Sequence, residues 1–285
     1  MNYPHLARRL FNTPLAIHPR KGEIITSALS DRLGLSGPGG CDLSVYDDED
    51  PFTHAHRGDP GYDNLEGIAV IPVQGTLVNK LGTLRPYSGM TGYDSVRQAF
   101  LCALADPAVK GVCLDIDSPG GEVAGCFDLA DEIYFARGRK PVHAILSECA
   151  YSAAYAIASA ADHISLPRTG GIGSIGVIMM HVDTSRQLDK EGLKVTLITF
   201  GDRKAETHPC LPLSDTARQA LQAEADAAGE LFISTVARNR GISEDAVRDT
   251  HAACFMAPEG IRLGLADAIA APDVAFNQLM EIAGV

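Results

Sequence analysis

The chain has 285 residues and a formal net charge of −12, from 24 Lys and Arg against 36 Asp and Glu. Hydrophobic residues make up 46% and charged residues 21%, which is typical of a folded globular protein and excludes a largely disordered one. The acidic balance disfavours a non-specific nucleic-acid binder, which would carry a basic surplus. Neither a signal-peptide core nor a run of about 18 apolar residues occurs, so we expect a cytoplasmic protein without a membrane anchor.

The seven cysteines include no C-x-x-C pair, and several lie in apolar runs, as Cys113 does. This pattern favours free, buried thiols in a reducing compartment over a disulfide framework or a zinc site. We therefore expect no structural metal on these spacings.

The first 36 residues have a loose helical spacing that Pro14 and Pro19 interrupt. Residues 37–64 are rich in Gly, Pro and acidic residues, which is typical of a linker or an arm. The sequence thus predicts an N-terminal arm and linker over 1–64, a folded domain over 65–272 and a C-terminal tail over 273–285.

From Gly67 onward, short buried strands alternate with helices. The predicted strands cover 68–73, 109–117, 141–146, 163–166, 176–182 and 195–200. The predicted helices cover 91–105, 122–137, 152–161, 186–191, 243–251 and 257–264, together with a long one that Ser214 or Asp215 caps and that ends before Gly241. This alternation with short connections predicts an α/β protein with largely parallel strands and right-handed crossovers.

The motif Asp117-Ser-Pro-Gly-Gly121 stands where a predicted strand ends and a helix begins. Gly120 and Gly121 can adopt backbone angles that turn their N–H groups outward, toward a phosphate or a developing oxyanion. An ordinary strand-to-helix turn explains the tetrapeptide equally well.

Ser152 opens an Ala-rich helix, where its hydroxyl would lie near free N–H groups and the positive end of the helix dipole. A plain N-cap is the simpler explanation of this serine taken alone. The G-x-S-x-G elbow of the α/β-hydrolases is absent.

Two further motifs follow in the chain. Gly171, Gly173 and Gly176 satisfy G-x-G-x-x-G, but an apolar run that favours a strand follows them, whereas a dinucleotide site requires a helix. Lys204 comes directly after a predicted strand and Gly201. A lysine can act as a general base only when desolvation or neighbouring cations favour its neutral form, so an exposed loop lysine is the simpler explanation of Lys204 alone.

In chain order, Ser-Pro-Gly-Gly, Ser152 before alanines, Gly-Ser174-Ile-Gly-Val and Gly-x-x-Lys204 resemble the signal peptide peptidase A family of serine peptidases. Those enzymes use a Ser/Lys dyad on a crotonase/Clp-protease-like fold. The separations of 22 residues from Ser152 to Ser174 and 52 to Lys204 also resemble that family, and the similarity spans about 65 to 270. Residues 67–78, 85–93 and 11–15 are similar to its bacteriophage branch, the head maturation proteases of lambda-like phages.

The resemblance implies that Ser152 is the nucleophile, that Lys204 is the general base and that Ser174 orients the lysine. The backbone N–H of Ala153 and that of Gly120 or Gly121 would form the oxyanion hole. It further implies a homo-oligomer that needs no cofactor and that cleaves scaffold, portal or capsid polypeptides. Alanines follow Ser152 where many relatives have glycines, so we expect their methyl groups to narrow the site.

Three alternatives stay open. His181, 29 residues after Ser152, is the candidate base of a Clp-like Ser/His/Asp triad on the same fold. A non-catalytic capsid assembly protein is the second, although the intact Ser152, Ser174 and Lys204 argue against it. The third is an acyl-CoA-binding crotonase, which would share the fold and the oxyanion geometry without depending on these residues.

Overall fold

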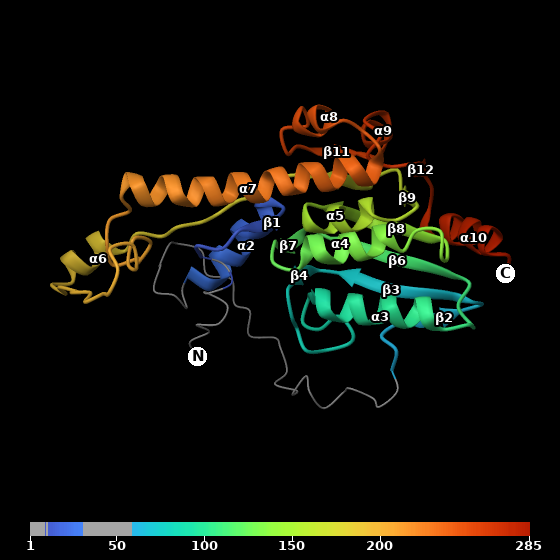
Figure 1. The fold of residues 1–285 in the computed structure, drawn as a ribbon, viewed down its shortest axis with the longest axis horizontal. Helices are drawn as coiled ribbons and strands as arrows, with labels where there is room; N and C mark the ends of the chain where they lie inside the picture. The colour runs from blue at the N-terminus through green and yellow to red at the C-terminus, as the bar shows by residue number, and fades with distance from the viewer. Residues whose placement is uncertain (1–8, 10, 31–58) are drawn as a thin grey trace.

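The computed structural model describes residues 9, 11–30 and 59–285. They form the predicted α/β fold, with mostly parallel sheets and flanking helices (Figure 1). The strands are β1 (Leu15–Ile17), β2 (Asp63–Leu65), β3 (Ile68–Gln74), β4 (Thr76–Val78), β5 (Met90–Gly92), β6 (Gly111–Ser118), β7 (Gly120–Glu122), β8 (Val142–Tyr151), β9 (His163–Leu166), β10 (Gly171–Gly173), β11 (Cys254–Met256) and β12 (Ala268–Ile269). The helices are α2 (Pro19–Ser30), α3 (Tyr93–Ala105), α4 (Cys126–Phe135), α5 (Ala153–Ser159), α6 (Ser185–Lys190), α7 (Asp215–Arg240), α8 (Glu244–Arg248), α9 (Ala257–Arg262) and α10 (Pro272–Ala283).

The larger sheet is built around the parallel strands β3, β6 and β8, with β9 and β10 both parallel to β8. Successive side chains of a strand point to opposite faces of a sheet. Ile68, Cys113 and Ile145 therefore pack on one face, against Ala275 and Leu279 of α10. The neighbours of these residues along each strand point to the opposite face and belong to the main core under α3, α4 and α5. Helix α7 lies across α4 and α5 (Figure 1).

The smaller sheet has the order β1-β7-β4-β5. β1 was not predicted, because the helical spacing suggested one interrupted helix. Pro14 and Pro19 bracket this stretch, and a residue that precedes a proline is biased toward extended backbone. The stretch pairs antiparallel with β7, and α2 starts only at Pro19, a position where helices tolerate proline.

Two predicted strands, 176–182 and 195–200, are wrong. Residues 176–182 form only an isolated bridge, between Ile178 and Leu15. Residues 195–200 belong to no strand, and Ile198 and Phe200 are almost fully exposed. An apolar run becomes a strand only where a neighbouring strand binds its backbone groups, and among the described residues 195–200 have no such neighbour.

Helix boundaries agree better with the sequence. Ser214 caps α7 by accepting a hydrogen bond from the N–H of Ala217 (3.1 Å), and Gly241 ends the helix in the left-handed conformation. The helix predicted over 122–137 starts only at Cys126, because Gly120–Glu122 forms β7. The stretch assigned to a tail contains most of α10, which packs on β6 and β8. None of the described helices is both long and apolar enough to cross a membrane.

The six described cysteines are free thiols, as predicted. Their burial is less uniform than expected, because only Cys113 and Cys126 are buried and Cys254 is exposed. Burial raises the pKa of the Cys113 and Cys126 thiols to about 12, so both stay protonated at neutral pH. Cys41 lies outside the described residues.

We expect His143, a core residue of β8 as predicted, to make the fold sensitive to acid. Its side chain is buried, and this burial, together with the neighbouring His163, lowers its pKa from 6.5 to about 4. The unfolded chain then binds the proton more readily. The stability that neutral His143 contributes is therefore full above pH 6.5 and is lost as the pH falls toward 4, at a cost of about 3 kcal/mol.

Urea denaturation of His143→Leu should accordingly show a flatter dependence of the unfolding free energy on pH in that window. His208→Leu, at an exposed position, is the control and should keep the wild-type slope. Equal slopes for wild type and His143→Leu would contradict the assignment.

Candidate active site

Ser152 lies at the junction of β8 and α5, and its side chain is fully buried. Its backbone, at φ 54° and ψ −120°, is strained for a non-glycine residue, and such strain clusters at functional sites. The conformation is held by a hydrogen bond from the Ser152 N–H to the carbonyl of Gly173 (2.8 Å). The hydroxyl donates a longer one to the carbonyl of Gly176 (3.4 Å).

The glycine turn at the start of β7 lies directly against Ser152. Gly120 has φ 96°, and a Cβ there would collide with the carbonyl oxygen of Ala16 and lie 3.0 Å from the Ser152 Cβ. A Cβ on Gly121 would overlap the carbonyl of Leu77 in β4. Only glycine at both positions lets this turn reach the serine.

The turn also distinguishes between the two predicted oxyanion donors. The N–H of Gly120 donates to Ser118 Oγ within the turn (3.1 Å), so Gly121 is the better candidate. Ala153 begins α5, and N–H groups in the first turn of a helix have no intrahelical acceptor. The two candidate N–H donors thus come from different elements, Gly121 from β7 and Ala153 from α5, and both elements lie next to Ser152.

Ser174 follows β10, which pairs with the end of β8, so it lies near Ser152 in the sheet. It is buried, has φ 55°, and donates its N–H to the carbonyl of Ala253 (2.8 Å). Partial desolvation raises the pKa of the Cys254 thiol, and a hydrogen bond with the Ser174 side chain opposes that shift. Among the described residues, no hydrogen bond joins the Ser152 hydroxyl to the Ser174 hydroxyl, directly or through a third side chain.

Lys204 is not brought to Ser152 within one chain. It is exposed and belongs to residues 183–214, which we call the arm from here on; this segment is distinct from the N-terminal arm predicted over 1–64. The arm carries α6 and extends to one end of the molecule, well away from α5 (Figure 1). Among the described residues, no group forms a hydrogen bond or an ion pair with the lysine Nζ.

His181, the base of the alternative triad, does not pair with a carboxylate. Its Nδ1 lies 2.9 Å from Oδ1 of Asn12, and its Nε2 is buried without a partner among the described residues. A neutral amide beside the ring cannot stabilise an imidazolium as an aspartate does. The dinucleotide alternative also lacks its context, because Gly171–Gly173 form β10 and the next helix starts only at Ser185.

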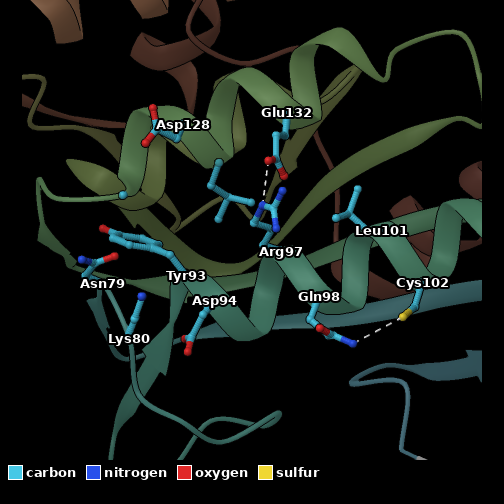
Figure 2. Close-up of a pocket in the computed structure, with 12 residues that line it drawn as sticks. Asn79, Lys80, Tyr93, Asp94, Arg97, Gln98, Leu101, Cys102, Asp128 and Glu132 are labelled. Atoms are coloured by element: carbon cyan, nitrogen blue, oxygen red, sulfur yellow. Dashed lines mark hydrogen bonds and ion pairs between the residues drawn. The ribbon is translucent and has the colours of Figure 1, made fainter.

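A surface hollow of about 780 Å³ lies between α3 and α4 (Figure 2). An ion pair between Arg97 and Glu132 (2.7 Å) spans it. Its lining residues are Asn79, Lys80, Tyr93, Asp94, Arg97, Gln98, Leu101, Cys102, Gly125, Asp128, Leu129 and Glu132. It shares no residue with the predicted site, so we do not assign the chemistry to it.

The chain is similar to known proteins over much of its length. The model of peptidase family S49 matches residues 135–285. The chain is 40% identical to capsid assembly protease C of Escherichia phage lambda over 277 residues, 93% of this chain and 63% of that protein. It is also 40% identical to head-tail preconnector protein GP5 of Enterobacteria phage P21 over 274 residues, 93% of this chain and 55% of that protein. The chain therefore spans less than two thirds of the length of either relative.

A more distant relative is a putative signal peptide peptidase SppA of Enterococcus faecium, 28% identical over 178 residues. The matched part is 61% of this chain and 51% of that protein. The similarity thus extends from the phage proteins to cellular peptidases.

We expect Gly120→Ala to destabilise the protein by about 3 kcal/mol, because it combines a positive φ with a steric collision. Gly138→Ala is the matched control, since Gly138 has φ 82° but open space where its Cβ would lie. It should cost only about 1 kcal/mol. Urea unfolding measures the loss of unfolding free energy in both variants. Equal losses would mean that the close contact of Gly120 with Ala16 and Ser152 does not matter for stability.

Proposed function

Because the chain belongs to peptidase family S49, we propose that it is a serine endopeptidase in which Ser152 forms the acyl-enzyme and Lys204 is the general base. The observation that carries this proposal is the surroundings of Ser152. A buried serine in a strained strand-to-helix turn meets a glycine turn that can present N–H groups to an oxyanion. This arrangement suits acyl transfer.

In the proposed reaction, Ser152 Oγ attacks the carbonyl carbon of the peptide bond while Lys204 accepts the hydroxyl proton. The N–H groups of Gly121 and Ala153 stabilise the oxyanion, and one such donor typically lowers the barrier by about 3 kcal/mol. The lysine then protonates the leaving amine, and water hydrolyses the acyl-enzyme. Ser174 would orient the lysine.

We further propose that a second copy of the chain completes the site. Lys204 is exposed within one chain, whereas a general-base lysine must be desolvated. The arm also exposes large apolar side chains, which mark an interaction surface. These are Leu193, Val195, Ile198, Phe200 and Leu211. A homo-oligomer in which the arm of one protomer covers the site of its neighbour would bury both the apolar side chains and the lysine.

The two phage relatives suggest the biological role. One is a capsid assembly protease and the other a head-tail preconnector protein, and both match nearly the whole of this chain. We propose that this peptidase cuts scaffold, portal or capsid proteins while a phage head assembles in the cytoplasm of the bacterial host.

The dyad predicts that Ser152→Ala and Lys204→Ala each lower the rate of casein hydrolysis by about 10⁴-fold. Lys194→Ala, at another exposed position of the arm, is the control and should retain activity. Mixing the two inactive variants under subunit exchange should restore part of the activity if neighbouring protomers share the site. Retained activity in Lys204→Ala, together with its loss in His181→Ala, would instead support the triad.

The exposed arm predicts that Phe200→Asp lowers both the molar mass in solution and the rate of casein hydrolysis. Light scattering after size-exclusion chromatography measures the first quantity. Ile282→Asp on α10 is the control, because that side chain is 63% exposed but lies outside the arm. An unchanged molar mass for Phe200→Asp would exclude the arm as the assembly surface.

A further inference from the structure

The N-terminal strand β1 lies between two segments of the candidate active site. On one side it pairs antiparallel with β7, through the pairs Leu15–Glu122, Ala16–Gly121 and Ile17–Gly120. On the other side, Leu15 and Ile178 exchange both of their backbone hydrogen bonds (2.9 Å each). β1 is therefore bound through its main chain on both edges, as an extended peptide is when it adds to a sheet.

The register of β1 places one carbonyl against the proposed oxyanion donor. His18 N–H donates to the carbonyl of Pro119 (2.7 Å), and Val123 N–H donates to that of Pro14 (3.4 Å). Hydrogen-bonded pairs alternate along an antiparallel ladder. The two bonds just named flank the pair Ala16–Gly121, which is therefore a hydrogen-bonded pair of the ladder. The Gly121 N–H accordingly points to the carbonyl of Ala16.

That carbonyl also lies close to Ser152. A Cβ built on Gly120 would meet both the Ala16 oxygen and the Ser152 Cβ, so the two atoms flank the same small space. The His18 ring is 4.9 Å from that of Tyr151, the residue before the serine. Ala16 and Ser152 are both fully buried. A polypeptide substrate could not reach Ser152 on this path while β1 remains in place.

We propose that β1 is an intramolecular substrate, which presents the bond between Ala16 and Ile17 to Ser152; this inference rests on the proposed peptidase function. Ser152 Oγ bonds to the Ala16 carbonyl carbon and its proton goes to the base. The C–N bond then breaks, and the Ile17 amine leaves with a proton. Water hydrolyses the ester, and the products are residues 1–16 and a chain that starts at Ile17.

The neighbouring bonds are less suitable. The carbonyl of Leu15 accepts from Ile178, on the edge of β1 opposite β7, so it points away from the Gly121 N–H. Ala16 also has the smallest side chain of the strand, in a position with no exposed surface. The site therefore favours an extended polypeptide with a small residue before the cleaved bond, which agrees with the narrowing expected from the alanines after Ser152.

Intact-mass analysis and N-terminal sequencing of the full chain test the proposal, with casein hydrolysis measured in parallel. Wild type should produce a species that begins at Ile17, and Ser152→Ala should not. If wild type hydrolyses casein but keeps its Ala16–Ile17 bond, the inference fails and the peptidase function stands. If wild type cleaves neither itself nor casein, the proposed function fails and the inference fails with it.

A pair of arginine substitutions separates presentation of this bond from a structural role of β1. Ala16→Arg cannot fit the buried position, so the rate of cleavage at Ala16–Ile17 should fall by about 10-fold or more while casein hydrolysis is at least maintained. Ile24→Arg on α2, at a 61% exposed position, should leave both rates unchanged. An equal fall of both rates in Ala16→Arg would count against the proposal, because β1 would then serve only to hold the fold together.

Discussion

The site depends on the close approach of a glycine turn to the serine at the end of β8. Three parallel strands, β3, β6 and β8, bring their carboxyl ends to one edge of the sheet. β6 leads directly into Gly120 and β8 directly into Ser152, so two loops far apart in sequence meet at that edge. Neither glycine has room for a Cβ there. The helices and the second sheet surround this contact.

The same turn has a second consequence, because β7 forms the middle of the smaller sheet. β4 binds one of its edges and β1 the other. β1 comes from the N-terminal part of the chain, far from β7 in the sequence. An edge strand with unpaired N–H and C=O groups readily accepts an added strand. The edge of β7 that faces Ser152 is therefore a place for an extended peptide, which the chain fills with its own residues.

Lys204, in contrast to the buried Ser152, is exposed to solvent. It lies on an arm that leaves Ile198 and Phe200 almost fully exposed and that extends beyond the sheet. The site is thus closed from within by β1 and incomplete at the position of the proposed base. Under the proposed function, a single chain arranged in this way would stay inactive.

The fold class, the ends of the longest helix and the family could be predicted from the sequence. The alternation of strands and helices predicted the α/β class, and Ser214 and Gly241 marked the ends of α7. The order of the motifs indicated the family, because the types and spacing of residues are local properties. The three-residue strands β7 and β10 escaped prediction, since glycine-rich segments have no hydrophobic period. The apolar run 195–200 was predicted as a strand because an apolar pattern alone does not show whether its side chains become buried.

The sequence by itself therefore determined the family and named the residues proposed to carry the chemistry, and the tertiary structure decided how those residues are placed. Only the strand register shows that Gly121, and not Gly120, directs its N–H toward β1. Only the fold shows that Lys204 is distant from Ser152 and that the carbonyl of Ala16 is near it. Backbone direction and burial depend on contacts between segments far apart in the chain, and no local pattern encodes those contacts.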